Sequence, residues 1–570
     1  MTDPSPPGEL PSERIVRLSG GSYGGKGEGI LRIDTVIAGS GLGGLFEDLA
    51  IAMPKTLLIG TDSFDSFLES NGIREAALAS RDYAGLRRMF VTKPLPHALE
   101  TSLDGFLSDE GSPLIVRSSS LLEDSVDLPF SGVYESYVIP NSHPDRTKRL
   151  GQLLDAIRLV YASLFSDDAV AYRDAVGCVH ADEKMAVVIQ ELVGTKRASW
   201  FYPRLSGTAQ SYNYYPVSYA KPEDGLCVAA LGLGAWVVDG GASFRFCPKY
   251  PQMNATSPDL AGEGSQYRFL ALASGRPEPD FLSGQNAALE ELELSEAEGS
   301  GVLDYIVSTW DRDDCRLVPG TTSSGSRILD LAPILKYQAL PLASAISAVL
   351  DAFTAEEGGP VEIEYAQDRD PGTGAETLFL LQVKPLHSAS VGSTTEISDD
   401  MAGSGFIYSD KSMGHGTKDG ITDIIWLDPA RFNRAETIPM ASELTAFNRT
   451  AGELGRHYLL IGPGRFGSRD PWLGVPVTFS NIAWARVIVE TEIPGFSVDF
   501  SFGSHFLHNI TGTNAGYMAI PSGGPSFVDW DWLRGLPRER TGKNAVWSKV
   551  ERPLTIVMDG KNGRAVVGKP

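Results

Sequence analysis

The chain has 570 residues, of which 42% are hydrophobic, and a formal net charge of −23 at pH 7. This length predicts about two to four domains of roughly 150 residues each, and the acidity disfavours nonspecific binding to nucleic acid or to an anionic membrane. No apolar run approaches the ~20 residues of a membrane span, and cysteines without CxxC spacing argue against zinc and disulfide frameworks and favour a reducing, cytoplasmic compartment.

The N-terminal residues combine a polar leader with a glycine-rich run. Residues 1–14 are rich in proline, and we expect them to be a disordered leader and not a signal peptide. A short strand predicted over 15–18 leads into the run Gly20 to Gly27, which nearly matches the P-loop pattern G-x-x-x-x-G-K. Gly27, however, stands where that pattern needs Ser or Thr for magnesium. Glycines let a backbone approach phosphates and Lys26 supplies a point charge; the plain alternative is a flexible loop with a solvated lysine.

Core elements follow, and then a segment that is rich in polar groups. Apolar spacing predicts a strand over 53–61 and helices over 62–71, 74–90 and 98–107. The run LIV at 114–116 predicts a buried strand, and Arg117, three serines and an acidic pair come after it. Core packing does not place a charge directly after a buried strand. Hydroxyls and backbone N–H groups beside a guanidinium can hold a multiply charged phosphate chain, whereas the alternative is a solvated serine-rich loop with one structural ion pair.

The segment VRSSSLLEDSVDLPFSGVYESY at 116–137 resembles the hallmark of the nucleotide-binding domain of pyruvate phosphate dikinase and phosphoenolpyruvate synthase. That domain is an ATP-grasp fold, which rifampin phosphotransferases and glucan water dikinases share. Further segments match it in the same order up to about residue 390. The resemblance implies that Lys26, in GGKG, contacts the ATP phosphates and that Arg117 and Ser118 belong to the nucleotide site.

The fold class implied by the resemblance is α+β, with an ATP-grasp domain of two subdomains followed by a separate α+β C-terminal domain. The expected boundaries are 15–185 and 186–390 for the subdomains and 391–405 for a linker. Residues 406–570 are then expected to hold the acceptor or substrate.

An apolar strand predicted over 185–193 follows an amphipathic helix predicted over 147–165. In the family this strand is the hinge between the subdomains. The resemblance therefore implies that backbone around Gln190, Glu191 and Val193 reads the adenine edge, while apolar side chains enclose the ring. The alternative is a plain buried strand.

Two later segments depart from a simple match. Residues 230–241 resemble the family's GLGE loop near the phosphates, but Ala235 replaces the glutamate. Either another carboxylate substitutes for it or that contact is absent. Residues 258–299 are polar with an acidic run at 290–293, and we expect a solvated excursion or linker.

Two strands predicted over 360–366 and 378–385 carry the most specific pattern. Side chains at i and i+2 of a strand share a face, so Glu362 lies with Glu364, and Gln382 with Lys384. A hairpin of these strands gathers hard oxygen donors of the kind that Mg2+ prefers beside an ammonium group. The resemblance to D/E-I-E and L-Q-x-R-P motifs implies that Glu362, Glu364 and Gln382 are the metal ligands. Lys384 stands where the family usually has arginine, so the charge is kept but the bidentate hydrogen bonding of a guanidinium is lost. The alternative to a metal site is that these residues form an exposed polar face of the two strands.

The remaining residues predict a different domain with short strands over 475–479, 485–490 and 496–500. A Gly/Arg run at 462–469 can bind an anion through Arg465, Ser468 and backbone amides, or it is a structural turn.

Features of a complete phosphoenolpyruvate synthase are not expected here. Subtracting 390 from 570 leaves 180 residues, fewer than the ~250 of the pyruvate barrel, and the phosphohistidine loop TSHA is missing. His505, in GSHF, is the nearest counterpart and a candidate phosphoryl acceptor or general base; His415, in MGHG, is a second candidate. A lone histidine is more often structural.

The function predicted from these features is an ATP-dependent phosphotransferase of the dikinase type that uses ATP and Mg2+. Lys26, Arg117 and Lys384 would neutralise the triphosphate, and positioning with charge compensation would do most of the catalysis. The expected partner is an unidentified small-molecule acceptor, or a histidine. Two alternatives are an ATP-grasp ligase, which activates a carboxylate as an acyl phosphate for amide formation, and a non-catalytic nucleotide-sensing module.

Overall fold

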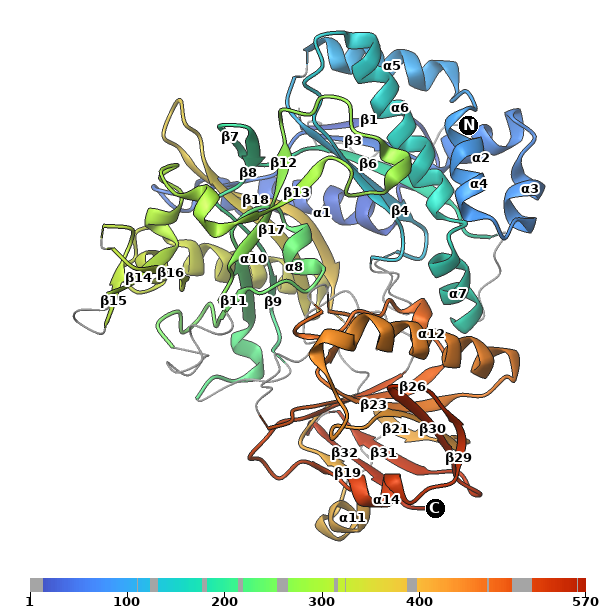
Figure 1. Cartoon of the computed structure of the whole chain (residues 1–570). Helices are drawn as coiled ribbons and strands as arrows, with labels where there is room; N and C mark the ends of the chain where they lie inside the picture. Colours follow the sequence, from blue (N-terminus) through green and yellow to red (C-terminus); the bar gives the residue numbers. More distant parts are fainter. Residues whose placement is uncertain are drawn as a thin grey trace.

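The computed structural model describes most of the chain: residues 14–109, 111–123, 132–176, 182–213, 219–253, 265–311, 316–322, 324–386, 397–468, 471–494, 515–560 and 562–570. Most of the expected leader, residues 387–396 of the linker region, and His505 lie outside the described residues. Helices combine with mostly antiparallel strand pairs, which is an α+β composition (Figure 1). Within the described ranges, no helix is both long enough and apolar enough to cross a bilayer.

The first sheet is built around a largely buried central strand, β6, and its order is β1-β3-β6-β4-β5. Its strands are β1 (Ile15–Arg17), β3 (Thr56–Ile59), β6 (Met185–Glu191), β4 (Leu114–Ser120) and β5 (Ser136–Ile139). Helices cover one face and bury an aromatic cluster that includes Phe64, Phe67 and Tyr161. They are α2 (Thr61–Ser70), α3 (Arg74–Ala79), α4 (Tyr83–Val91), α5 (His97–Asp109) and α6 (Arg146–Ser163).

The single helix predicted over 74–90 was wrong, because two helices occupy this range. α3 ends at Ala79, and α4 begins after Asp82, whose side chain accepts a hydrogen bond from Gly85 N at 2.8 Å. This N-cap satisfies one of the unpaired amides at the start of a new helix.

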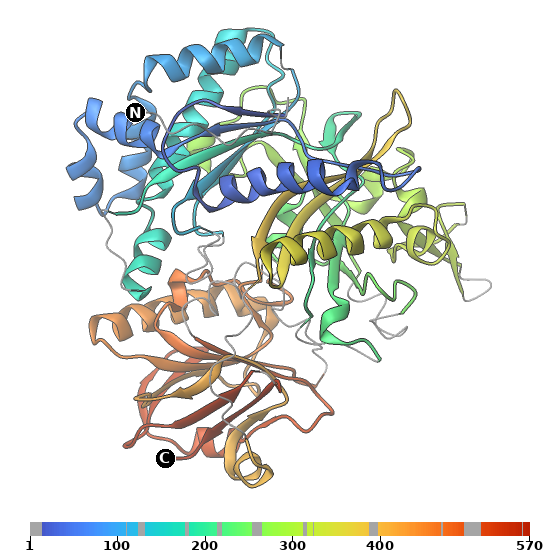
Figure 2. The ribbon, with the colours of Figure 1, turned by 180° about the vertical axis from the view of Figure 1, so that it is seen from behind.

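The second sheet has the order β11-β10-β9-β17-β18-β2. Its strands are β11 (Phe244–Phe246), β10 (Leu226–Ala230), β9 (Leu205–Gln210), β17 (Val361–Arg369), β18 (Glu376–Pro385) and β2 (Ala50–Ala52). Figure 2 shows the two long helices beside it, α1 (Gly24–Ser40) and α10 (Leu342–Glu357). β2 joins this sheet from far away in the sequence by pairing in parallel with β18.

Helix α1 was not predicted, because four glycines in its first six residues indicated a loop. The structure shows that these glycines permit close packing. A Cβ at Gly24 would lie 2.1 Å from the carbonyl oxygen of Ser119 in β4, and one at Gly29 would lie 2.4 Å from that of Val383 in β18. α1 therefore contacts both main sheets and fixes where they meet.

Two smaller sheets are separate from the second sheet and have the orders β13-β12-β8-β7 and β15-β14-β16. Their strands are β13 (Leu289–Glu293), β12 (Arg268–Ala273), β8 (Trp200–Tyr202), β7 (Thr195–Arg197), β15 (Arg316–Pro319), β14 (Val307–Asp311) and β16 (Ser326–Leu329). The solvated linker predicted over 258–299 was therefore wrong for its described residues, since β12 and β13 pair there and Phe269 and Leu292 are buried. The acidic residues are the polar positions of β13, an edge strand, where charges discourage further pairing.

The C-terminal part, residues 397–570, contains two stacked sheets and a covering helix (Figure 1). The seven-stranded sheet comprises β20 (Lys411–Met413), β27 (Gly516–Ile520), β26 (Ala485–Thr491), β23 (Tyr458–Pro463), β22 (Asp423–Leu427), β30 (Ala545–Lys549) and β29 (Arg538–Thr541). The five-stranded sheet comprises β21 (His415–Lys418), β31 (Thr555–Asp559), β32 (Arg564–Gly568), β19 (Gly405–Ser409) and β28 (Phe527–Val528). Successive residues of β23 point to opposite faces of the sheet. Leu459 packs in the core between the two sheets, and Leu460 packs in the core under α12 (Thr437–Glu453).

Shorter elements complete the chain and correct one predicted strand. They include α7 (Asp167–Val176), α8 (Ala235–Val238), α9 (Ala332–Leu335), α11 (Asp399–Ser404), α14 (Trp530–Arg534), β24 (Arg465–Phe466) and β25 (Gly474–Val475). The strand predicted over 475–479 is only the two-residue β25, which ends before Pro476. β26 matches the strand predicted over 485–490, and 496–500 lies outside the described residues.

Candidate functional site

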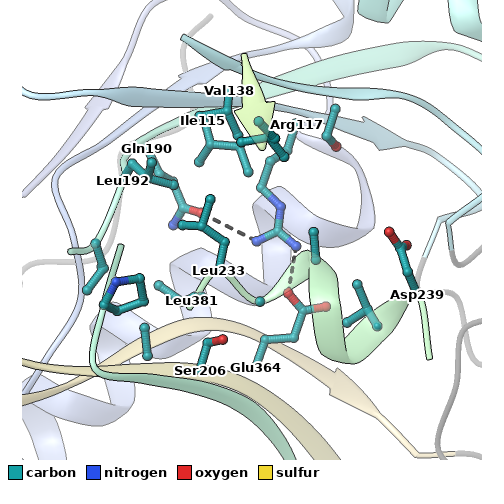
Figure 3. Close-up of a pocket in the computed structure, with 18 of the residues that line it drawn as sticks. Ile115, Arg117, Val138, Gln190, Leu192, Ser206, Leu233, Asp239, Glu364 and Leu381 are labelled. Atoms are coloured by element: carbon teal, nitrogen blue, oxygen red, sulfur yellow. Dashed lines mark hydrogen bonds and ion pairs between the residues drawn. The ribbon is translucent and has the colours of Figure 1, made fainter. Parts of the chain in front are cut away.

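A pocket lies between the first and second sheets, as Figure 3 shows. Strand register builds one wall. Ile115 and Arg117 share a face of β4, where Ile115 lies opposite both Val138 of β5 and Gln190 of β6. The second sheet supplies the other wall. The lining residues labelled in Figure 3 are Ile115, Arg117, Val138, Gln190, Leu192, Ser206, Leu233, Asp239, Glu364 and Leu381.

Arg117 extends across this pocket and joins the two sheets. Its Nη2 atom lies 2.8 Å from Glu364 Oε2 and 2.5 Å from Gln382 Oε1, and Nη1 lies 3.5 Å from Gln190 Oε1. The Arg117 and Glu364 side chains are only 11% and 13% exposed, so little water screens the pair. Arg117 lies in the middle of β4, and the prediction that it follows the strand was wrong.

Lys26 approaches the pocket from the first turn of α1. Its Nζ forms an ion pair with the fully buried carboxylate of Glu123 and donates to Ser118 Oγ at 3.3 Å. The N-terminal end of α1 is held by Ser119, whose Oγ accepts from Gly27 N at 2.9 Å and donates to Tyr23 O at 2.6 Å. Lys26 therefore has a fixed position at the positive end of a helix dipole, where anions are favoured.

The three serines have structural roles, and the alternative of a solvated serine-rich loop is wrong. Ser118, Ser119 and Ser120 are strand residues with no exposed surface. Ser120 N donates to Glu123 Oε2, and Ser120 Oγ accepts from Glu123 N, both at 3.1 Å. Ser118 is not among the residues that line the pocket; its Oγ accepts from Lys26 Nζ at 3.3 Å and donates to Glu123 Oε1 at 3.1 Å.

The predicted hairpin of carboxylate and amide residues is confirmed. β17 and β18 pair antiparallel, with Glu362 opposite Lys384 and Glu364 opposite Gln382. Lys384 Nζ lies 2.9 Å from Glu362 Oε1, and both residues are buried. Glu362 and Lys384 thus form an ion pair two residues along the strands from the Glu364–Gln382 pair.

Acidic residues do not cluster as a preformed metal site: in the described ranges no three His, Cys, Asp or Glu side chains gather to hold an ion. Two oxygen atoms nevertheless converge, because Glu364 Oε2 and Gln382 Oε1 both contact the same atom, Arg117 Nη2. Carboxylate and amide oxygens in this arrangement suit Mg2+ with phosphate and water as its other ligands.

The end of β6 provides the polar edge of the pocket. Gln190, Glu191, Leu192 and Val193 all line it. Glu191 N donates to Lys55 O at 3.0 Å, and Leu192 N donates to Pro113 O at 2.8 Å, which holds this backbone in place.

Sequence reasoning missed three residues of the site. Glu123 was noted only as part of an acidic pair, and its contact with Lys26 depends on tertiary structure. Asp239, in the run VVDGG, lines the pocket four residues after Ala235. Tyr134 also lines it, and burial raises the pKa of its phenol far above the ordinary value, so it stays neutral.

The sequence-predicted residues are therefore largely brought together. Lys26, Arg117, Gln190, Glu191, Val193 and Glu364 line one pocket, and Ser118, Gln382, Glu362 and Lys384 connect to it by contact or register. His415 begins an edge strand of the C-terminal part and is not among the lining residues.

Comparison with known proteins assigns the family. The family described as "Pyruvate phosphate dikinase, AMP/ATP-binding domain" matches residues 22–403. The chain belongs to this family. Its pyruvate phosphate dikinase AMP/ATP-binding domain therefore contains every pocket residue named above. It also contains both main sheets except for β1.

This chain is similar to parts of several curated proteins. The chain is 22% identical to the phosphoenolpyruvate synthase of Escherichia coli (strain K12) over 72% of this chain and 46% of that protein. It is 28% identical to the phosphoenolpyruvate synthase of Deinococcus radiodurans over 38% of this chain and 28% of that protein. It is also 30% identical to a rifampicin phosphotransferase of Streptomyces sp over 28% of this chain and 16% of that protein. The chain thus spans less than half the length of these curated relatives.

Proposed function

We propose that this chain is an ATP-dependent phosphotransferase of the dikinase type. The observation that supports it most is that Lys26, Arg117 and Glu364, which are far apart in sequence, line one pocket. We further propose that 15–185 and 186–390 are the two subdomains of an ATP-grasp fold, that 391–405 is a linker, and that 406–570 hold the acceptor.

The adenine base is proposed to lie at the Gln190–Val193 end of the pocket. Ile115 and Leu192 offer apolar surface there, and Leu381 offers it from the second sheet. The Glu191 carbonyl and the Val193 amide are the proposed contacts of the adenine edge, since the amides of Glu191 and Leu192 already bond within the protein.

The triphosphate is proposed to lie along Lys26 and Arg117. In a chain with a net charge of −23, these cations concentrate positive charge locally where four phosphate charges must be balanced. Arg117 is suited to bidentate contact with phosphate because its guanidinium presents a planar fork of donors. Lys384 is proposed to act less directly, by adding charge from beside Glu362.

Mg2+ is proposed to bind at Glu364 and Gln382, with Glu362 beside them. The oxygens that now contact Arg117 would turn to the ion as the guanidinium turns to phosphate, which keeps every charge paired. When bound, the metal neutralises charge on the phosphates, and this chain's own residues hold the nucleotide in place and exclude water.

The acceptor is proposed to bind in the C-terminal part, either as a small molecule or as His505 in a relay. The ATP-grasp fold also allows a ligase that makes an acyl phosphate. Identifying the reaction products therefore distinguishes a phosphotransferase from a ligase. The proposed reaction class predicts AMP as the nucleotide product.

The test is incubation of the full chain with Mg–ATP and a metabolite library, with nucleotides and phosphorylated products scored by mass. AMP together with a phosphorylated product supports the proposal. ADP with an amide product would indicate a ligase, and ATP binding without turnover would indicate a sensing module; either result rejects it. Product formation that is lost in Arg117→Ala but complete in His505→Ala would reject the histidine relay alone.

A further inference from the structure

The Gly/Arg run after β23 has no role in the function proposed above, and the structure fixes its backbone firmly. β24, which begins at Arg465, pairs in parallel with β25, and Arg465 N donates to Leu473 O at 3.3 Å. Phe466 N donates to Glu490 Oε1 at 2.8 Å. Gly474 must lack a side chain, because its Cβ would lie 1.8 Å from Arg465 O. These contacts fix the position of the backbone that carries the Arg465 side chain.

The Arg465 side chain extends from the C-terminal part and packs against Gly240, which lies just after α8. A Cβ at Gly240 would lie 2.5 Å from Arg465 Nη2 and 3.1 Å from its Cζ. Arg465 is only 4% exposed. The φ of Gly240 is +77°, a backbone conformation that residues with a side chain rarely adopt. Glycine is therefore needed there both to form the turn and to leave space for the Arg465 guanidinium.

Gly240 directly follows two residues of the pocket wall, Val238 and Asp239. In Figure 3, Asp239 and Leu192 lie at opposite ends of the pocket, with Arg117 between them. If the adenine lies at the Leu192 end, the terminal phosphates extend past Arg117 toward Asp239. Arg465 is not itself among the lining residues, but its guanidinium packs against Gly240, the residue that directly follows Asp239 at this end of the pocket.

A second contact holds the C-terminal part to the other side of the pocket domain. Asp168 of α7 accepts a hydrogen bond from Ser480, and the Tyr172 and Phe479 rings lie 4.8 Å apart. Figures 1 and 2 both show the C-terminal part beneath α7 and beneath the second sheet. The Arg465–Gly240 contact and the α7 contact thus connect the C-terminal part to two separate elements of the pocket domain.

We propose that Arg465 is a nucleotide-binding residue that the C-terminal part contributes in cis, and that it contacts the terminal phosphate of ATP. This inference rests on the proposed function, since it takes the pocket to be the ATP site. Arginine retains its charge when buried and binds phosphate through two parallel hydrogen bonds. The pocket domain then binds the adenosine and first phosphate by itself, and recognition of the triphosphate requires the docked C-terminal part, which also holds the acceptor.

The test compares binding of Mg–AMP-PNP, a non-hydrolysable ATP analogue, with binding of AMP, by calorimetry on the full chain. Arg465→Ala is expected to weaken AMP-PNP about 10-fold or more, because a hydrogen bond to a charged group is lost, and to leave AMP within about 2-fold of wild type. Arg465→Lys should give an intermediate loss. The control is Arg456→Ala, which removes an arginine of the C-terminal part that contacts Asp423 and Glu539 and should not change either ligand.

The outcomes separate this inference from the proposed function. A wild-type chain that binds neither ligand rejects the proposed function and the inference with it. A wild-type chain that binds both, with an unchanged AMP-PNP to AMP affinity ratio in Arg465→Ala, rejects the inference alone, as does an equal loss of both ligands. If thermal melting shows that Arg465→Ala does not fold, Arg465→Lys decides, and an unchanged ratio there overturns the inference.

Discussion

Arg117→Ala is the substitution that should separate stability from nucleotide binding. The guanidinium contacts Glu364 and Gln382 across the pocket, with side-chain exposures of 11% and 13% for the ion pair. Removing it leaves a buried carboxylate without its cation. Breaking a buried pair on one side costs about 3–5 kcal/mol of stability, and we expect the free energy of unfolding to fall by that order.

The loss in nucleotide affinity has a different cause and can be separated. Arg117 is proposed to contact phosphate, and a charged hydrogen bond contributes about 1.5–3 kcal/mol, which predicts roughly 10-fold or greater weakening of Mg–ATP. Adding Glu364→Gln to Arg117→Ala removes the unpaired charge. The double variant should therefore regain much of the stability but none of the nucleotide affinity.

Arg204→Ala is the matched control. Arg204 also forms a buried ion pair, with its Nη1 3.1 and 2.9 Å from the two carboxylate oxygens of Glu376, but it is not a lining residue of the pocket. Urea unfolding and calorimetry with Mg–AMP-PNP measure both quantities for each variant. Comparable destabilisation of the two single variants, with affinity lost only in Arg117→Ala, is expected. Wild-type affinity in a folded Arg117→Ala protein would refute the phosphate role.

Two further predictions concern packing and pH. Gly29→Ala should destabilise by about 1–3 kcal/mol, since its Cβ would meet Val383 O at 2.4 Å, whereas Gly39→Ala in the same helix has open space and should stabilise by up to about 1 kcal/mol; equal chemical unfolding curves would contradict the close packing of α1. Burial, with a smaller effect of Arg486, lowers the pKa of Lys418 from 10.5 to about 8. The unfolded chain holds this proton more tightly, so the destabilisation is complete below pH 8 and disappears as the pH rises toward 10.5. Lys418→Met should therefore raise stability by up to about 3 kcal/mol at pH 7 and little at pH 10.5, and an equal gain at both values in pH-dependent melting would reject this explanation.

Local pattern was enough to predict the hairpin of the site, because the two-residue period of a strand fixes which side chains share a face. Glu364 and Gln382 then lie opposite each other in the pairing of β17 with β18. The position of Arg117 was harder to predict. A charge in the middle of a buried strand is unfavourable by itself, and it is explained by contacts with Glu364 and Gln382, which lie 247 and 265 residues away.

Helix α1 shows a second limit of sequence reasoning. Glycine has a low helix propensity, so the run before Lys26 indicated a loop, yet Gly24 and Gly29 are required where α1 meets Ser119 and Val383. The information that overrides local propensity lies in strands β4 and β18, which are distant in the sequence. Lys26 nevertheless lines the pocket, and a cation among glycines offers the same chemistry in a helix turn as in a loop.

The most direct test of the nucleotide site is a crystal structure of the full chain with Mg–AMP-PNP. The account predicts adenine against the Gln190–Val193 backbone, phosphates within hydrogen-bond distance of Lys26 and Arg117, and the metal on Glu364 and Gln382. A nucleotide bound at any other place, with the Arg117–Glu364 pair still intact, would contradict it.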